Sequence, residues 1–265
     1  MLGGRPQTGP SGSGESELLL AVDALFRRWR MLTAFVLLGL VLVLTWLAIG
    51  VHVHGWATAF DAPTASWIEN SVHRSHRLAE ASLITARLGT PVTVAAAGLV
   101  GGALLIWRAR SLRPGVVVIG TVAGAVLANN AIRAVVYRPP TEAEIQALPR
   151  LSTVHHTFPS GHVAGIGALL GIIAAGIVVG RSRIVQALAT ASVVAGVVVV
   201  AFSRLCLGVH WLSDVLGGAL LAGVFVSLGS LALATHSDQS VRARVGVGVP
   251  FETTGLDDQR DMSTR

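Results

Sequence analysis

The most distinctive chemical groups in the sequence lie between two apolar runs, in residues 203–214. This segment contains Arg204, His210 and Asp214. His210 and Asp214 are four residues apart, so they would share one face of a helix. A carboxylate there can hold one imidazole nitrogen as N–H and leave the other nitrogen as a nucleophile or base. A His–Asp pair that only anchors the following helix would have the same spacing.

A second polar segment, Phe158-Pro159-Ser160-Gly161-His162, precedes another apolar run. Ser160 can cap a helix, and Gly161 lets another group approach the backbone closely. The free N–H groups of a helix start form an anion site, which His162 in the first turn would face. An ordinary helix cap with an incidental histidine is the alternative.

Two further cations, Arg133 and Arg138, stand at the end of a third apolar run. Taken alone, they could simply extend to lipid headgroups. Together, the three segments supply cations, a nucleophile, an acid and an orienting carboxylate, which is the inventory for phosphoryl transfer. The sequence lacks an acidic cluster suited to Mg²⁺ or Ca²⁺, so we expect neither a metal nor a cofactor.

The composition indicates that a membrane positions these groups. Hydrophobic residues make up 52% of the 265-residue chain and charged residues only 13%, against about 25% charged in soluble domains. Six apolar runs are long enough to span a bilayer as helices. We therefore predict an all-α, polytopic membrane protein with six transmembrane helices, at roughly 31–51, 86–107, 115–137, 163–180, 184–203 and 212–234.

Arginine clusters set the expected orientation. They lie before the first run, between the second and third, between the fourth and fifth, and after the sixth, all on one side if six spans are counted. Arginine-rich connections mark the cytoplasmic side. We therefore expect a multi-pass membrane protein with both termini in the cytoplasm and the three polar segments at the outer membrane face. The bacterial plasma membrane is the expected location because an outward-facing site would suit the recycling of a carrier lipid in a bacterial envelope.

The chain divides into three parts. Residues 1–30 are expected to be a disordered N-terminus plus a cytoplasmic amphipathic helix, although this helix could equally be an extension of the first span. Residues 31–234 form the transmembrane domain, in which the connection 52–85 holds a short surface helix. Residues 235–265 are expected to be a disordered cytoplasmic tail.

Composition also excludes several classes of protein. The net charge of +6 comes from arginines that are scattered between apolar runs, so we expect no nucleic-acid partner. The single Cys206 excludes an intrachain disulfide and a cysteine-based zinc site. No phosphate-binding loop for nucleotide-driven transport is present. The oligomeric state is unknown from sequence.

Two of the segments resemble signatures of the type 2 phosphatidic acid phosphatase (lipid phosphate phosphatase) superfamily. Residues 159–162 are similar to its PSGH signature, and residues 203–214 match SRx5HxxxD with every spacing kept. The first signature, Kx6RP, is imperfect. In the preferred register Arg133 replaces the lysine, Arg138-Pro139 matches the first half of an Arg-Pro-Arg-Pro ending, and Pro140 replaces the signature arginine. In the other register Arg138-Pro139 is the signature pair and Ala131 replaces the lysine.

The resemblance, over roughly residues 60–234, implies metal-independent hydrolysis through a phosphohistidine. His210 would attack phosphorus, Asp214 would orient it, and His162 would protonate the leaving oxygen and later activate water. The phosphoryl oxygens would be held by Arg133, Arg138, Ser160, Gly161 and Arg204.

A site at membrane depth implies a lipid phosphate substrate, and we favour a polyprenyl diphosphate such as undecaprenyl diphosphate. Phosphatidic acid, diacylglycerol pyrophosphate or phosphatidylglycerophosphate would also fit. A lipid phosphotransferase would use the same residues. An anion or lipid transporter is the non-enzymatic alternative, and a histidine metal site is a further one, built from residues among His52, His54, His73, His76, His155 and His156.

Overall fold

The computed structural model describes residues 12–72, 75–141, 143, 156–178 and 180–244. Within these ranges all regular structure is helical. In chain order the helices are α1 (Gly12–His52), the short 3-10 helix η1 (Trp56–Thr58), α2 (Asp61–Val72), α3 (His76–Leu88), α4 (Pro91–Ala109), α5 (Leu112–Val135), α7 (Gly161–Val178), α8 (Arg183–Cys206) and α9 (Leu212–Arg244).

Among the described residues, six helices are long and apolar enough to cross a membrane, which confirms the predicted fold class. They comprise Asp23–His52, Val92–Ala109, Leu112–Val135, Gly161–Val178, Arg183–Cys206 and Leu212–Ala234. Their outward surfaces carry large exposed apolar side chains, such as Ile184, Leu188 and Val198 on α8. Such surfaces are expected where lipid, rather than water, surrounds the helices.

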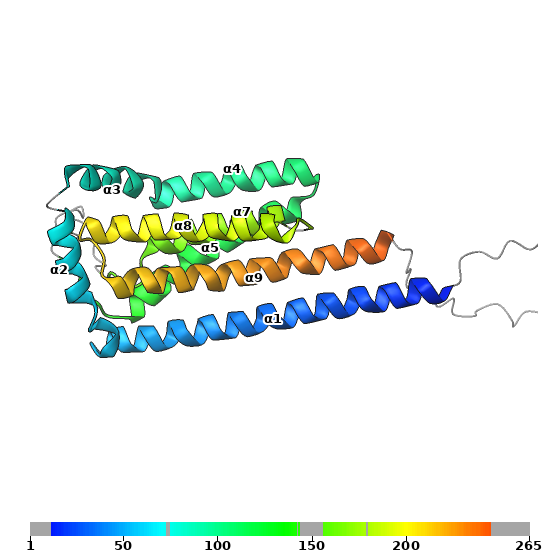
Figure 1. The fold of residues 1–265 in the computed structure, drawn as a ribbon, viewed down its shortest axis with the longest axis horizontal. Coiled ribbons are helices and arrows are strands. Elements are labelled where there is room, and N and C mark those ends of the chain that lie inside the picture. The colour runs from blue at the N-terminus through cyan, green and yellow to red at the C-terminus, as the bar shows by residue number, and fades with distance from the viewer. Residues whose placement is uncertain (1–11, 73–74, 142, 144–155, 179, 245–265) are drawn as a thin grey trace, which may run out of the picture.

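The long helices run side by side, and α2 crosses them at one end (Figure 1). α7 is the central helix and packs against α4, α5, α8 and α9, while α1 packs on α9. Small residues allow the close contact between α7 and α9, as expected for helices packed within a membrane. A Cβ added at Gly171 would lie 2.5 Å from Val226, and one added at Gly167 would lie 2.7 Å from Ala222.

Several element boundaries differ from those expected. Residues 12–52 form one uninterrupted helix, so residues 12–30 extend the first span rather than form a separate helix. The second span begins at Pro91 rather than 86, because Gly89 and Thr90 separate α4 from α3. The connection between the first two spans contains α2 and α3 instead of one short helix, and α3 continues past residue 85 to Leu88.

The last helix also runs further than expected. α9 continues to Arg244, although a disordered tail was expected from 235. The remaining residues expected to be disordered, 1–11 and 245–265, lie outside the described ranges.

Candidate functional site

The polar segments meet at the end of the bundle that α2 crosses. α8 ends at Cys206, and Gly208 (φ 65°) takes the left-handed conformation that turns the chain toward α9. α9 starts at Leu212 and α7 at Gly161. The ends of three spans therefore surround one site, as the count of spans predicted.

His210 is backed by a carboxylate. Its Nδ1 lies 3.4 Å from Asp214 Oδ2, and both side chains are buried, Asp214 completely. Oδ2 also accepts the backbone N–H of Trp211 at 3.0 Å, which holds the carboxylate in the first turn of α9. The His210–Asp214 contact is an ion pair rather than an aligned hydrogen bond, and such contacts often tighten only when substrate binds. Because Nδ1 faces Asp214, Nε2 is the nitrogen left for chemistry.

The Ser160 loop is bonded to the same turn of α9. The Ser160 N–H donates to the Asp214 carbonyl oxygen at 2.9 Å, and the Ser160 carbonyl accepts from Ala164 at 3.0 Å, which begins α7. Gly218 makes this contact possible, since a Cβ there would lie 2.5 Å from the Ser160 oxygen. The Ser160 hydroxyl is fully buried with no hydrogen-bond partner among the described residues. A buried hydroxyl without a partner suits a site that a ligand's oxygen completes.

His162 lies in the first turn of α7, partly exposed. Its ring is within electrostatic range of Arg204, His210 and Arg133. Gly89, between α3 and α4, packs against this ring, and a Cβ there would lie 3.2 Å from His162 Cδ2. The structure thus brings together two histidines that stand far apart in the sequence.

Arg204 and Arg133 supply positive charge on the His162 side. Arg204 is buried at the end of α8. Arg133 donates from Nε to the Pro159 carbonyl at 3.1 Å and from Nη2 to the Thr157 carbonyl at 3.2 Å. Arg133 therefore braces the loop that leads into α7, in addition to placing a cation near His162.

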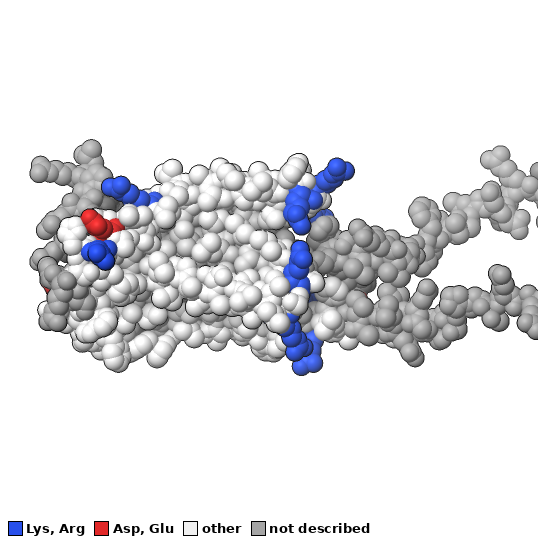
Figure 2. Space-filling model, turned by 45° about the horizontal axis from the view of Figure 1, so that its top comes forward, with Lys and Arg blue, Asp and Glu red and all other residues white. Residues whose placement is uncertain are grey.

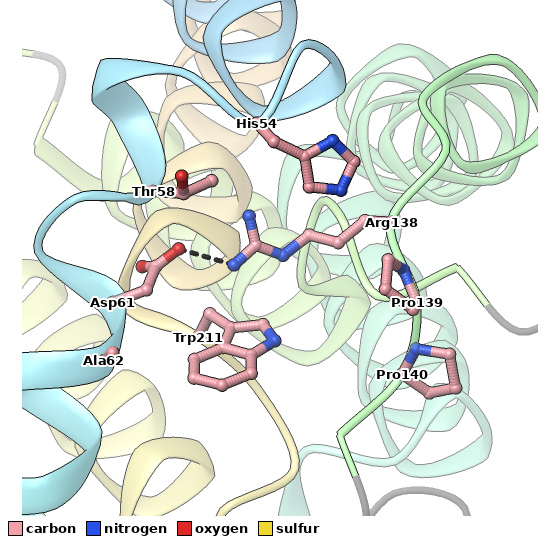
Figure 3. A pocket seen from close by; sticks show the side chains of 8 residues that line it. All are labelled: His54, Thr58, Asp61, Ala62, Arg138, Pro139, Pro140 and Trp211. Carbon is pink, nitrogen blue, oxygen red and sulfur yellow. Dashed lines mark hydrogen bonds and ion pairs between the residues drawn. The ribbon is translucent and has the colours of Figure 1, made fainter.

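Arg138 is placed differently from the expectation that it binds phosphoryl oxygens. Its Nη2 pairs with Asp61 Oδ2, and its Nε lies 3.2 Å from Asp214 Oδ1. The guanidinium is buried and lies over the Trp211 ring, 5.6 Å from the centroid. Figure 3 shows it extending from its own loop to Asp61 on α2. Two carboxylates therefore neutralise this cation.

Asp61 is a site residue that the sequence reasoning missed. It begins α2 and is buried, where an ordinary surface-loop carboxylate would be exposed. Its Oδ1 accepts the Ser213 N–H and its Oδ2 accepts the Ser213 hydroxyl, each at 2.9 Å. The only sequence signal for this role was a carboxylate on a connection expected at the same membrane face.

A cavity of about 240 Å³ opens beside Arg138. It is lined by His54, Thr58, Asp61, Ala62, Arg138, Pro139, Pro140 and Trp211 (Figure 3). Within the described ranges, no three histidine, cysteine or acidic side chains are grouped so that they could hold a metal ion.

Comparison with known proteins agrees with this arrangement. The family model described as PAP2 superfamily matches residues 114–237, which include the three polar segments. A solved structure of a transmembrane PAP2-type phosphatidylglycerolphosphate phosphatase from Bacillus subtilis is similar in fold, with a TM-score of 0.57 and 22% identity over 77% of this chain and 96% of the other. No curated protein matched. Residues 114–237 are thus similar to the PAP2 superfamily, and this match together with the likeness in fold supports a membrane phosphatase that acts on lipid phosphates.

Proposed function

We propose that the protein hydrolyses a lipid phosphate or diphosphate without a metal, through a phosphohistidine formed on His210. One observation supports this most directly. Asp214 contacts one ring nitrogen of the buried His210, and His162 lies within electrostatic range of both His210 and Arg204. This arrangement supplies a nucleophile, an orienting group, an acid and a cation.

In the first step, His210 Nε2 attacks phosphorus while the bond from phosphorus to the leaving oxygen breaks. The leaving oxygen takes a proton from His162. Asp214 stabilises the positive charge that develops on the His210 ring, because it faces the Nδ1–H. Arg204, Arg133, the Ser160 hydroxyl and the Gly161 N–H stabilise the phosphoryl oxygens.

In the second step, His162 has lost its proton and acts as a base. It takes a proton from a water molecule, and the resulting nucleophile attacks the phosphohistidine. The nitrogen–phosphorus bond breaks, inorganic phosphate forms, and His210 returns to its starting state. The same residue serves as acid and then as base, as microscopic reversibility requires.

For the substrate, we favour a polyprenyl diphosphate such as undecaprenyl diphosphate. The site lies at the end of a bundle whose outer surface is apolar, which suits a phosphate head on a long lipid tail. Phosphatidic acid and phosphatidylglycerophosphate are the alternatives.

We further propose a bacterial plasma membrane location with the site outward and both termini cytoplasmic. The α4–α5 and α7–α8 turns and the helix ends beside them carry Arg108, Arg110, Arg113, Arg181 and Arg183. Figure 2 shows basic residues forming a band at the end of the bundle away from α2. Arginine-rich ends face the cytoplasm. In this arrangement residues 31–234 form the catalytic unit.

The test is phosphate release by purified protein in EDTA. The panel contains undecaprenyl diphosphate, phosphatidic acid, diacylglycerol pyrophosphate and phosphatidylglycerophosphate. Release of inorganic phosphate in EDTA, together with acid-labile ³²P on wild type but not on His210→Ala, is the expected result. Loss of activity in EDTA would contradict the metal-independent mechanism, and activity of His210→Ala would contradict the covalent step.

Two controls separate the alternatives. Transfer of ³²P to an added lipid alcohol in preference to water would identify a phosphotransferase. Flux of phosphate across proteoliposomes that persists in His210→Ala would identify a transporter.

A further inference from the structure

The geometry points to Asp61 as a positioning residue that acts through Arg138 to fix the Asp214 carboxylate against His210. In this arrangement Arg138 orders the site and does not bind substrate phosphate. The inference rests on the proposed function, because it assigns roles within the same reaction.

The contacts form a continuous chain of alternating charge. Asp61 pairs with Nη2 of Arg138, Nε of Arg138 lies 3.2 Å from Oδ1 of Asp214, and Oδ2 of Asp214 lies 3.4 Å from Nδ1 of His210. The two oxygens of Asp214 therefore face different partners. The Arg138 ion pair at Oδ1 and the Trp211 N–H at Oδ2 limit rotation of the carboxylate, which keeps Oδ2 beside the His210 Nδ1.

A second route joins Asp61 to the same turn of α9. Asp61 accepts both the N–H and the hydroxyl of Ser213, the residue before Asp214. A carboxylate at the first turn of a helix is also stabilised by the helix dipole. α2 thereby holds the start of α9 through its backbone and through Arg138.

Burial explains why Arg138 requires two carboxylates. Asp61, Arg138 and Asp214 are all buried. A buried charge that lacks a partner is costly, so each acid depends on the guanidinium. If Asp214 were the only partner, the arginine would cancel the negative charge that His210 needs when its ring becomes positive. Asp61 shares the guanidinium and leaves part of that negative charge in place.

The ion pairs that Arg138 makes with two carboxylates argue against a role for this arginine in binding phosphate. A guanidinium binds phosphate in a fork through two of its N–H groups. In this protein Nε and Nη2 face acids, and both acids would repel a phosphate placed beside them. Arg204 and Arg133, which lie around His162, remain the cations on the substrate side.

The experiment compares Asp61→Asn, Arg138→Gln and the double variant, in detergent, on the panel lipid that wild type hydrolyses fastest. Each single variant should lower kcat by about 10²-fold, the effect of an ångström-scale misplacement of catalytic groups. KM and the inhibition constant for inorganic phosphate should stay within about threefold, because substrate binding is not touched. The rate of ³²P incorporation on His210 in a single turnover should fall as kcat does.

The double variant tests whether Asp61 acts through Arg138. If it does, the double variant should be no slower than the slower single variant, whereas independent roles would multiply to a loss of about 10⁴-fold. Glu80→Gln is the matched control, since this carboxylate is exposed on α3 and pairs only with the exposed His76 among the described residues. It should leave kcat within about twofold of wild type.

Three results would overturn the inference. They are wild-type kcat in Asp61→Asn, multiplicative losses in the double variant, or a weaker affinity for inorganic phosphate at unchanged kcat in Arg138→Gln. If Asp61→Asn does not fold, Ser213→Ala removes one hydrogen bond to Asp61 and should still lower kcat severalfold at unchanged KM; wild-type kcat there would reject the role. If wild type itself releases no phosphate from any lipid, the proposed function fails first.

Discussion

The two histidines of the site lie in regions of opposite charge. His210, at the start of α9, faces Asp214, which is linked through Arg138 to Asp61. His162, at the start of α7, lies within electrostatic range of Arg204, Arg133 and His210. Under the proposed mechanism, the carboxylate behind His210 would stabilise the positive charge that develops on the attacking ring, whereas His162 would transfer protons beside the cations that hold the phosphoryl oxygens. The difference teaches that the groups around a histidine decide which step it can serve.

Removing the proposed nucleophile should have the largest effect. His210→Ala should lower kcat by at least about 10⁴-fold, because the residue proposed to accept the phosphoryl group is lost. His76→Ala, which changes an exposed histidine at the start of α3, is the control and should keep wild-type activity. Phosphate release from the panel lipids measures both. A His210→Ala protein that retained a tenth of the activity would remove the distinction between the histidines.

Removing the charge of Asp214, the acid beside His210, should have the second-largest effect. Asp214→Asn keeps the shape of the side chain but removes the charge that stabilises the His210 cation, so kcat should fall by about 10³-fold or more. The Arg138 guanidinium also loses one of its two acids. Single-turnover labelling of His210 with ³²P should slow in proportion. Labelling at the wild-type rate would show that His210 needs no carboxylate.

The choice of leaving group can separate the proposed proton-transfer role of His162 from the proposed covalent role of His210. With the lipid substrate, His162→Gln should lower kcat by about 10²-fold to 10³-fold, since both proton transfers are lost. With an aryl phosphate, whose leaving oxygen needs no proton, His210 should still be labelled and the phosphohistidine should accumulate. If the His162→Gln variant formed no phosphohistidine on His210 even with the aryl phosphate, His162 would do more than transfer protons.

The smallest effect is expected from the backbone beside His162. A Cβ at Gly89 would lie 3.2 Å from the His162 ring, so Gly89→Ala should shift the ring by a few tenths of an ångström and lower kcat by about 10-fold or less. Gly120→Ala is the matched control, because a Cβ there meets no other atom within 4 Å. Equal activity in the two variants, with equal thermal stability, would show that this contact has no catalytic consequence.

The sequence predicted the spans and the meeting of the polar segments for a simple reason. Apolar runs of bilayer length indicate spanning helices directly. Whether an odd or an even number of spans precedes a connection assigns that connection to one membrane face. That is why His162, Arg204, His210 and Asp214 could be expected near one another. The roles of these residues stay predictions until the variants are measured.

The pairing of Arg138 with Asp61 could not be read in the same way. The two residues are separated by 77 positions, and no periodic pattern links them. Whether an arginine at a membrane face binds a ligand or a buried acid depends on the exact packing of α2 across the bundle. Residues 235–244 are helical although their polar composition favours disorder, because α9 continues past the end of its apolar run to Arg244.

The bond from the Ser160 N–H to the Asp214 carbonyl has a mechanical consequence. It joins the residue before α7 to the first turn of α9, and Gly218 lets the two backbones lie in close contact. The helix starts that carry His162 and Asp214 are therefore coupled, and moving them apart would break this hydrogen bond. Under the proposed function, substrates would differ in how their lipid tails fit the surrounding helices rather than in the spacing of these two residues.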